Sequence, residues 1–502
     1  MAPELSLRDL LSGADVLSYV GDPDVAVAGL AYDSRRVEPG TLYFCVPGQH
    51  SDGHHFAGAA VRAGAAAMVV ERPLDVGVPQ ARVASARVAM APAAARFFEH
   101  PTAELRVIGI TGTNGKTTTA FLVRHLLERA GMQTGLLGTV KRIVGRAEEG
   151  VERTTPEAID LQATFRRMLD GGDRACAMEV SSHALALERV RGVRFAVAAF
   201  TNLTQDHLDF HRDMEDYFLA KRRLFTGDEL GSEPDRIIVN VDDPYGARLA
   251  AELAESATGA FVAVSPSGRE DAELRALDAD FDATGARFAI AAPEGRVEAR
   301  LPLPGDFNIA NALVAAAIAR ACGVPLEATA DALADAPTVP GRLEPVLAGQ
   351  PFAVFVDYAH TPDSLRNVLA AARRLCAGRL IVVFGCGGDR DRAKRPLMGE
   401  IGAALADLAV ITSDNPRSED PGAIIAEIVA GISAAEGRAS VEIEPDRRAA
   451  IGLALEAARE GDVVVIAGKG HEQGQEFAHG RKLPFDDREV ALEELRRSRS
   501  AA

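Results

Sequence analysis

The chain lacks the features that mark general nucleic-acid binders, zinc proteins and membrane proteins. It has 55 lysines and arginines against 72 aspartates and glutamates, so it offers no surplus of positive charge to nucleic acid. Its five cysteines are odd in number and none are paired at a metal-ligand spacing, which argues against disulfide and zinc frameworks. No uncharged apolar run reaches about 18 residues, and the first residues do not resemble a signal peptide. We therefore expect a soluble cytoplasmic protein.

The length of 502 residues and the order of apolar runs predict three α/β domains. We expect a small α/β domain in residues 1–103, a central P-loop mononucleotide-binding α/β domain in 104–338, and a Rossmann-like α/β domain in 339–502. The central domain should contain a hairpin over 281–291 and 296–303, followed by a helix over 307–321 that Asp306 caps. Runs that predict parallel strands in the last domain are 352–357, 380–385, 408–413 and 463–468.

A glycine-rich segment at residues 109–118 indicates a phosphate-binding loop. It reads Gly-Ile-Thr-Gly-Thr-Asn-Gly-Lys-Thr-Thr, after an apolar run typical of a strand and before a segment with helical spacing. The backbone of Gly112, Thr113, Asn114 and Gly115 would approach phosphate oxygens closely. Lys116 would neutralise the terminal phosphates, and the hydroxyl of Thr117, next to Thr118, would bind Mg²⁺. Ile110 stands where the common P-loop pattern has its first glycine.

Two further segments carry candidate metal ligands. Glu179 ends a predicted buried strand, where a carboxylate beside a phosphate loop is suited to hold Mg²⁺. His207 follows the next strand, and taken alone it fits an ordinary turn histidine better than a ligand. Lys221, on a predicted helix with Leu224 and Phe225, reads by itself as a surface lysine lying along an apolar stripe.

Four polar clusters follow the predicted strands of the last domain, at the edge where a parallel sheet binds ligands. Any one of them alone would be an ordinary turn, but four in one domain indicate a site. They are Asp-Tyr-Ala-His at 357–360, Gly-Gly-Asp-Arg at 387–390, Asp-Asn-Pro-Arg at 414–417 and Gly-Lys-Gly-His-Glu at 468–472.

The phosphate loop resembles that of Mur ligases and folylpolyglutamate synthases, and a series of motifs along the whole chain resembles the Mur ligase family. The series is closest to the members that add the third residue of the peptidoglycan peptide. Its motifs lie at 33–37, 111–118, 154–156, 179–183, 202–209, 220–221, 305–311, 341–344 and 357–362. The run at 414–417 resembles the form that adds meso-2,6-diaminopimelate, since lysine-adding relatives lack its arginine.

The resemblance implies ATP, two Mg²⁺ ions and a carbamate, derived from CO₂, on Lys221. A carbamate replaces the ammonium, which cannot bind a metal, with anionic oxygens. Thr117 and Glu179 would serve one ion, and Glu179, His207 and Lys221 as N6-carboxylysine the other. The implied catalytic residues are Lys116, Glu179, His207 and Lys221. The further residues implied to hold the nucleotide are Asn308, Asn311, Arg342 and Asp357.

The resemblance also implies two other substrates, UDP-N-acetylmuramoyl-L-alanyl-D-glutamate and meso-diaminopimelate, and we expect an enzyme that acts as a monomer. Residues implied to hold the UDP-dipeptide are Ser34, Thr154, Thr155, Ser181 and Arg189; relatives often place another polar contact where this chain has Leu187. Residues implied to hold diaminopimelate are Arg390, Asp414, Asn415, Pro416, Arg417, Gly468 and Glu472. The guanidinium of Arg417 would take the distal carboxylate in a bidentate pair, unless it is a solvated loop arginine.

The implied chemistry is ATP-dependent amide ligation through an acyl phosphate in peptidoglycan synthesis. Two alternatives remain open from the sequence. A folylpolyglutamate synthase should lack the motifs at 33–35 and 414–417, and both are present. A nucleotide-gated scaffold without ligase activity should have lost metal or phosphate residues. The residues of this kind that remain in place are Lys116, Glu179, His207 and Lys221.

Overall fold

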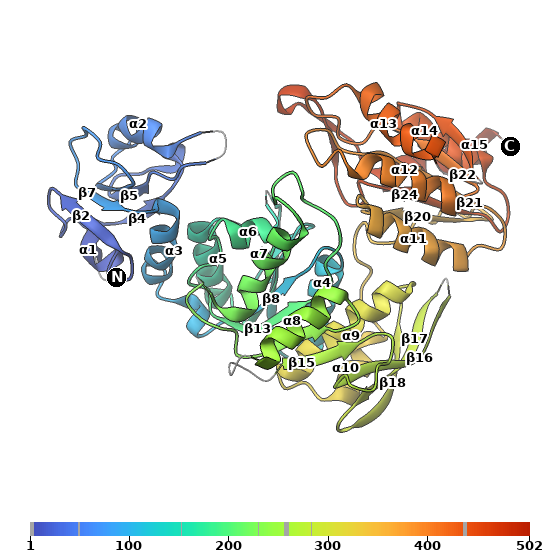
Figure 1. Cartoon of the computed structure of the whole chain (residues 1–502), viewed down its shortest axis with the longest axis horizontal. Coiled ribbons are helices and arrows are strands. Elements are labelled where there is room, and N and C mark those ends of the chain that lie inside the picture. The colour runs from blue at the N-terminus through green and yellow to red at the C-terminus, as the bar shows by residue number, and fades with distance from the viewer. Residues whose placement is uncertain are drawn as a thin grey trace.

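The computed structural model describes residues 5–48, 51–151, 153–228, 230–255, 261–282, 284–434 and 439–501. The chain forms three main β-sheets, each made from one contiguous part of the sequence and covered by helices (Figure 1). This arrangement confirms the predicted α/β class with three domains. The exact limits at 103 and 338 stay a prediction.

The N-terminal part is built on a five-stranded sheet with strand order β2-β7-β6-β5-β4. Its strands are β2 (Val16–Val20), β4 (Gly29–Ala31), β5 (Thr41–Phe44), β6 (Ala67–Val70) and β7 (Gln80–Val83), and a separate pair is formed by β1 (Leu5–Ser6) and β3 (Ala26–Val27). Its α-helices are α1 (Leu7–Leu10), α2 (Ala57–Arg62) and α3 (Ala86–Phe97).

The central part holds an eleven-stranded sheet, in the order β11-β10-β9-β12-β8-β13-β14-β15-β16-β17-β18. Its strands are β8 (Arg106–Thr111), β9 (Thr134–Leu137), β10 (Arg142–Val144), β11 (Ala147–Glu149), β12 (Ala175–Glu179), β13 (Phe195–Phe200), β14 (Ile237–Asn240), β15 (Phe261–Ser265), β16 (Leu274–Asp282), β17 (Gly285–Ala292) and β18 (Gly295–Leu301). Its helices are α4 (Lys116–Arg129), α5 (Ala158–Asp170), α6 (Ser182–Ala186), α7 (Met214–Thr226), α8 (Pro244–Glu255), α9 (Asp306–Ala321) and α10 (Leu326–Leu333).

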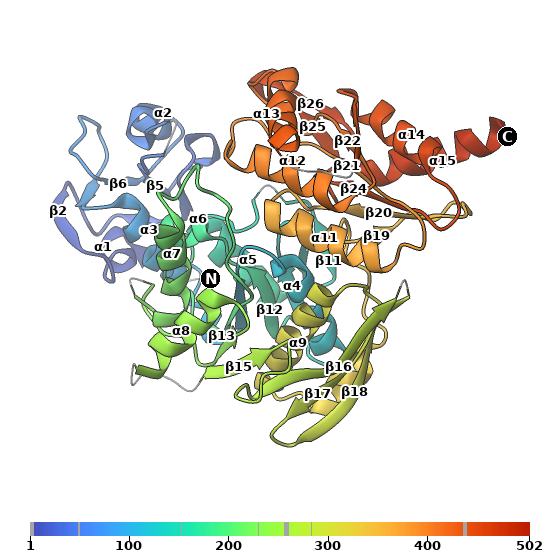
Figure 2. The same ribbon diagram turned by 45° about the vertical axis from the view of Figure 1, so that its right-hand side comes forward.

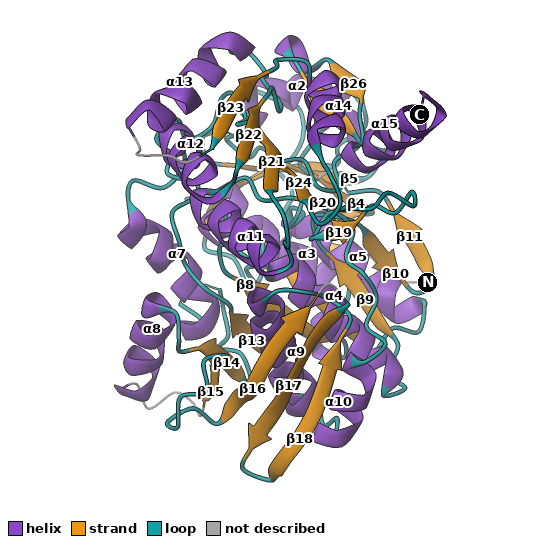
Figure 3. Cartoon of the chain, turned by 90° about the vertical axis from the view of Figure 1, so that its right-hand side faces the viewer, coloured by secondary structure: helices purple, strands orange, loops and turns teal. Residues whose placement is uncertain are grey.

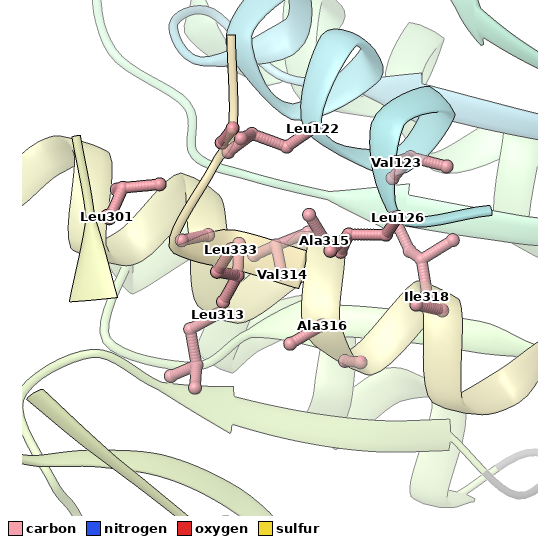
Figure 4. Close-up of a cluster of buried hydrophobic side chains, with 14 of the residues drawn as sticks. Leu122, Val123, Leu126, Leu301, Leu313, Val314, Ala315, Ala316, Ile318 and Leu333 are labelled. Carbon is pink, nitrogen blue, oxygen red and sulfur yellow. The ribbon is translucent and has the colours of Figure 1, made fainter. Parts of the chain in front are cut away.

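The central strands are buried on both faces, because successive side chains enter two different cores. Along β8, Val107 packs in one cluster and Ile108 in the other. The core on one side joins α4 to α9, where Leu126 lies against the small side chains of α9 (Figure 4). The small side chain of Ala315, which meets Leu126, lets the two helices approach closely.

The predicted hairpin is confirmed, because β17 and β18 pair as antiparallel neighbours, but its first strand begins at Gly285 and not at residue 281. Phe281 and Asp282 end β16, and the chain turns between β16 and β17. The strand pattern continued through this turn because apolar residues alternate on both sides of it. Asp306 is the first residue of α9 and not its cap; Gly305, with φ of +102°, precedes the helix.

The C-terminal part is a doubly wound sheet in the order β19-β20-β24-β21-β22-β23. Helices α11, α12 and α13 pack on one face and α14 and α15 on the other (Figure 3). Its strands are β19 (Glu344–Pro345), β20 (Ala353–Asp357), β21 (Leu380–Phe384), β22 (Leu408–Ile411), β23 (Ser440–Ile443) and β24 (Val463–Ala467), with a hairpin of β25 (Gly474–Glu476) and β26 (Lys482–Pro484). Its helices are α11 (Pro362–Arg374), α12 (Lys394–Leu405), α13 (Pro421–Ala434), α14 (Arg447–Ala457) and α15 (Asp487–Ala501).

Helix α11 lies over the central part, near α4 and α9 (Figure 2). Arg342 and Asp363 of the C-terminal part donate and accept hydrogen bonds across this junction. Among the described residues, no helix is both long and apolar enough to cross a membrane.

Candidate functional site

The phosphate-loop segment runs from the end of β8 at Thr111 to the start of α4 at Lys116, as the sequence predicts. Gly112 has φ of +153°, and a Cβ there would lie 1.9 Å from Thr201 Oγ1. Gly115 has φ of +83°, and a Cβ there would lie 2.3 Å from Asn311 Oδ1. Both positions therefore require glycine. Ile110, which departs from the common pattern, is a fully buried residue of β8, so the sheet core needs an apolar side chain there.

The loop is fixed from behind by the segment after β13. The backbone carbonyl of Asn202 accepts a hydrogen bond from the Thr113 N–H at 2.9 Å. The side-chain Oδ1 of Asn202 accepts one from the Asn114 N–H, also at 2.9 Å. The hydroxyl of Thr201 donates to the Asn114 carbonyl at 2.7 Å. Asn202 thus supports the loop; it lies within a motif that the sequence singled out, but its role was missed.

Lys116 and Thr117 begin α4 with their polar groups at the cavity. The ammonium of Lys116 donates to the carbonyls of Gly112 and Thr113 at 2.9 and 2.7 Å, and burial lowers the pKa of this lysine. The Thr117 hydroxyl donates to Glu179 Oε2 at 3.1 Å and accepts a hydrogen bond from Arg342 at 3.0 Å. The first turn of α4 is therefore tied both to β12 and to the C-terminal part.

Glu179 ends β12 and is almost fully buried. Its Oε1 accepts from the backbone N–H of Thr139 at 2.7 Å, and its Oε2 accepts from the hydroxyls of Thr139 and Thr117. All of these donors are neutral, so the carboxylate is oriented without having its charge cancelled by a direct ion pair. Such a group is suited to a divalent cation. Thr139, a single threonine in a short loop, was missed because nothing in its local sequence marks it.

Lys221 is buried, and its interpretation as a surface lysine is wrong. Its ammonium donates to the Gly112 carbonyl at 2.8 Å and lies 4.7 Å from the centre of the Tyr217 ring. Burial, together with the positive charge of Lys116, lowers its pKa well below the ordinary value of lysine. The amine is therefore held towards its neutral, nucleophilic form.

His207 faces the same cavity, with a left-handed backbone at φ of +57°. Removal of the ring from solvent lowers the pKa of His207 to about 3, so the imidazole is neutral at physiological pH. Its ring lies edge-on to His183, with 4.9 Å between the ring centres, and its Nε2 lies 3.3 Å from Asp206. A neutral imidazole can ligate a metal. Within the described part of the chain no group of three or more His, Cys, Asp or Glu side chains is arranged to hold a metal, and the expected ligand set has only one carboxylate and one imidazole.

A cavity of about 550 Å³ brings most of the expected residues together between the central and C-terminal parts. Asn308 is not among the lining residues of the cavity. Its side-chain amide donates to the Pro304 carbonyl, and its Oδ1 accepts from Asn311 at 3.2 Å, so Asn308 orients Asn311. The expected residues that line the cavity are Thr113, Asn114, Gly115, Lys116, Thr117, Thr118, Thr154, Thr155, Glu179, Ser181, Arg189, His207, Lys221, Asn311, Arg342, Asp357 and Arg390. It is also lined by residues absent from the predicted site, among them Thr139, Asn202, Asp206, Tyr358 and His360.

The side of the cavity nearest the N-terminal part is organised by Glu157. Its buried carboxylate accepts from Arg189 Nε at 3.0 Å and also binds Arg87 and Arg153. The hydroxyl of Thr155 donates to the Glu179 carbonyl at 2.9 Å. Ser34 lies farther away, in the N-terminal part, and does not line the cavity.

The remaining expected residues form a second cluster at the carboxyl ends of β22 and β24. Lys469, which is fully buried, donates to Asn415 Oδ1 at 2.9 Å and to Glu472 Oε2 at 3.0 Å, and lies 3.5 Å from Asp414. Asn415 donates in turn to Glu472 at 2.8 Å. Lys469 therefore organises this cluster, a role that its sequence context does not predict. Arg417 lies at its edge and is about 20% exposed, and so is not a freely solvated arginine.

Three family models match the chain in sequence order. They describe the Mur ligase family catalytic domain at residues 26–107, the Mur ligase middle domain at 110–319 and the Mur ligase glutamate ligase domain at 341–470. Together they cover most of the chain and all of the cavity's main motifs.

Curated relatives match over nearly the whole length. A protein of Syntrophomonas wolfei is 45% identical, with 98% of this chain and 99% of the relative covered, and one of Geobacillus kaustophilus is 48% identical, with 94% and 95% covered. Both are named UDP-N-acetylmuramoyl-L-alanyl-D-glutamate--2,6-diaminopimelate ligase. A solved structure of a ligase with the same name superposes with a TM-score of 0.70 at 31% identity, covering 99% of both chains.

Proposed function

The chain belongs to the Mur ligase family, and on that premise we propose that it joins meso-2,6-diaminopimelate to the D-glutamate γ-carboxylate of UDP-N-acetylmuramoyl-L-alanyl-D-glutamate, using ATP. This reaction lengthens the peptide of a peptidoglycan precursor. One observation carries the proposal: the same cavity is lined by the phosphate loop, by Glu179, His207 and Lys221, and by Arg189 and Arg390. Phosphate, acceptor and amine would therefore meet in one place.

The first step activates the carboxylate. A γ-carboxylate oxygen of the acceptor attacks the terminal phosphorus of ATP, the bond to the bridging oxygen breaks, and ADP leaves with that oxygen. The step brings two anions together, so it needs fixed positive groups and N–H dipoles more than a nucleophilic side chain. Lys116 would turn from its loop carbonyls towards the phosphates, and the N–H groups of the loop would bind their oxygens.

The side chains around the loop fit Mg²⁺. Thr117 and Glu179 would hold one ion, and Glu179, His207 and Lys221 the other, the last as a carbamate. Bound Mg²⁺ would screen the charge between the phosphates and the carboxylate. The fit rests on a buried carboxylate with neutral donors and on an imidazole whose pKa is far below its ordinary value.

The burial of Lys221 supports the proposal that this lysine is carbamylated. The lowered pKa favours the neutral amine, whose lone pair can form an N–C bond to CO₂ with loss of one proton. A protonated lysine would be costly to bury here, whereas the carbamate is an anion whose charge metal binding would offset. Isotopically labelled bicarbonate should give a carbamate signal in the parent by NMR and none in Lys221→Met.

The second step forms the amide. The amine of diaminopimelate attacks the acyl carbon, and the tetrahedral intermediate collapses to the amide. Phosphate leaves with one oxygen from the original carboxylate, and the proton that the amine nitrogen loses can pass to it. The protein's task here is to align the amine. Arg417 and Arg390 would bind the distal carboxylate, while Asn415 and Glu472 would read the distal ammonium.

We propose a monomer as the acting unit. We also propose that the reaction takes place in the cytoplasm.

The test follows oxygen from acceptor to phosphate. Acceptor labelled with heavy oxygen in its γ-carboxylate is incubated with ATP, Mg²⁺ and diaminopimelate. The acyl-phosphate route transfers one labelled oxygen to each released phosphate, whereas unlabelled phosphate would contradict it. ADP formation that needs no acceptor would instead favour the nucleotide-gated scaffold.

A further inference from the structure

The loop that carries Arg417 is held by a short strand, β25, from elsewhere in the sequence. Gln475 donates from its side chain to the Asp414 carbonyl at 2.7 Å, and the Glu476 N–H donates to Asn415 Oδ1 at 2.9 Å. The Arg417 N–H donates to the Glu476 carbonyl at 3.0 Å. Two consecutive residues of β25 thus fix three residues of this loop.

Arg417 has a left-handed backbone, with φ of +51°. This conformation is unfavourable for a side chain of its size and persists where the surroundings impose it. The backbone hydrogen bond from Arg417 to Glu476 supplies that constraint, together with the β-bridge between Arg417 and Phe477. The hairpin of β25 and β26 therefore sets the direction in which the Arg417 side chain extends from the backbone.

The side chain of Glu476 completes the arrangement. Its Oε2 accepts from Arg417 Nε at 3.0 Å, while Arg417 Nη1 donates to the Gly388 carbonyl at 2.7 Å. Two of the three guanidinium nitrogens are thus anchored on protein oxygens. The third, Nη2, makes no hydrogen bond to the described residues, and it remains available with the second hydrogen of Nη1.

We propose that Glu476 is the positioning residue for Arg417: it holds the guanidinium by Nε so that its free donors meet the distal carboxylate of the incoming amino acid. This inference rests on the proposed function. A planar guanidinium binds a carboxylate best in two parallel hydrogen bonds, which requires a fixed plane. Without the Nε anchor the plane could rotate about the long side chain, and binding would lose its preorganisation.

Electrostatics alone would disfavour a carboxylate at position 476, beside Arg417. A carboxylate beside Arg417 reduces the attraction that this arginine exerts on a second carboxylate. A site selected only for positive charge would exclude Glu476, so its presence is explained by orientation. The two effects predict opposite results for removal of the glutamate charge, which makes them separable.

The test compares Glu476→Ala with Glu476→Gln, since glutamine keeps an oxygen acceptor and loses the charge. Glu442→Ala, at an exposed position on β23 of the same part, is the matched control. For Glu476→Ala we expect KM for diaminopimelate to rise about tenfold, the effect of one hydrogen bond to a charged group. KM for ATP and for the UDP-dipeptide should stay within about twofold, and Glu476→Gln should recover most of the loss.

A double-mutant cycle keeps the test independent of folding. In an Arg417→Ala background, Glu476→Ala should have no further effect on KM for diaminopimelate, because the glutamate acts through the arginine. Additive effects would overturn the inference, as would a lower KM in both Glu476 variants or a parallel change in all three KM values. An active parent with Glu476 variants that match Glu442→Ala would also overturn it and leave the proposed function standing. A parent that makes no diaminopimelate product would overturn the proposed function itself.

Discussion

The side-chain amide of Asn114 donates a hydrogen bond to Asp363 Oδ2 at 2.8 Å, joining the phosphate loop to the first turn of α11. Thr204 donates to the same carboxylate oxygen at 3.4 Å. The nucleotide loop and the part of the chain that carries Arg417 are therefore directly connected. A reaction that needs ATP and an amine in one enclosed site depends on such connections.

Asp363→Ala should weaken this junction. One hydrogen bond contributes about 0.5–1.5 kcal/mol, so we expect kcat to fall about threefold to tenfold as the closed arrangement becomes less populated. Asp363→Asn keeps an acceptor for Asn114 and should stay within about twofold of the parent. Steady-state kinetics with saturating substrates make the comparison, with Asp331→Ala on α10 as an exposed control. Equal losses in the alanine and asparagine variants would contradict the role of the junction.

Gly115→Ala should damage nucleotide binding beyond its effect on stability. Gly131 is the matched control: its φ of +80° is close to the +83° of Gly115, but a Cβ there meets nothing within 4 Å. Both alanine variants should lose about 1 kcal/mol of unfolding free energy to backbone strain. Only Gly115→Ala, whose Cβ would overlap Asn311 Oδ1, should raise KM for ATP, by about tenfold or more. Denaturant unfolding and ATP titrations measure the two quantities separately.

Lys221→Met should abolish activity without weakening the fold. We expect a rate loss of about a hundredfold or more, as for removal of a group that stabilises developing charge. The pKa of Lys221 is lowered in the folded state, so the unfolded chain binds its proton more tightly. The resulting cost to stability is complete below the folded pKa and disappears as pH rises towards the ordinary lysine value. In bicarbonate-free buffer the variant should therefore have an equal or higher Tm at neutral pH, and a smaller advantage in more alkaline buffer.

Arg417→Ala should weaken the use of diaminopimelate by about one to two orders of magnitude, the value of a hydrogen-bonded charge pair. Arg417→Lys should recover little, because an ammonium cannot form the planar fork. The kcat/KM for diaminopimelate measures both effects. Parent-like kinetics in Arg417→Ala would remove the arginine from the site.

Features encoded in contiguous sequence were predicted well. The strand, glycine turn and helix around Lys116 follow from local spacing and backbone freedom, and the four polar clusters of the last sheet follow from parallel-strand geometry. Contacts between distant segments were not predictable in this way. Asp363 reads locally as a first-turn residue of a helix, and its link to Asn114 exists only after two domains meet.

The sequence also could not show which polar side chains are buried. The stripe that contains Lys221 indicates a helix face, but periodicity cannot say whether water or Gly112 and Tyr217 cover the ammonium. Asn308 and Asn311 share a helix face, and only packing shows that Asn311 lines the cavity while Asn308 orients the side chain of Asn311. Glu476 follows no motif and acquires its place from the pairing of β25 with the loop at 414–417.

The most direct test is a competition between amines. The purified protein is given ATP, Mg²⁺, UDP-N-acetylmuramoyl-L-alanyl-D-glutamate and equal amounts of meso-diaminopimelate and L-lysine, and the product is weighed by mass spectrometry. The account predicts a product that carries diaminopimelate almost alone, with one ADP formed for each amide. A lysine product in comparable or greater amount, or no product at all, would contradict it.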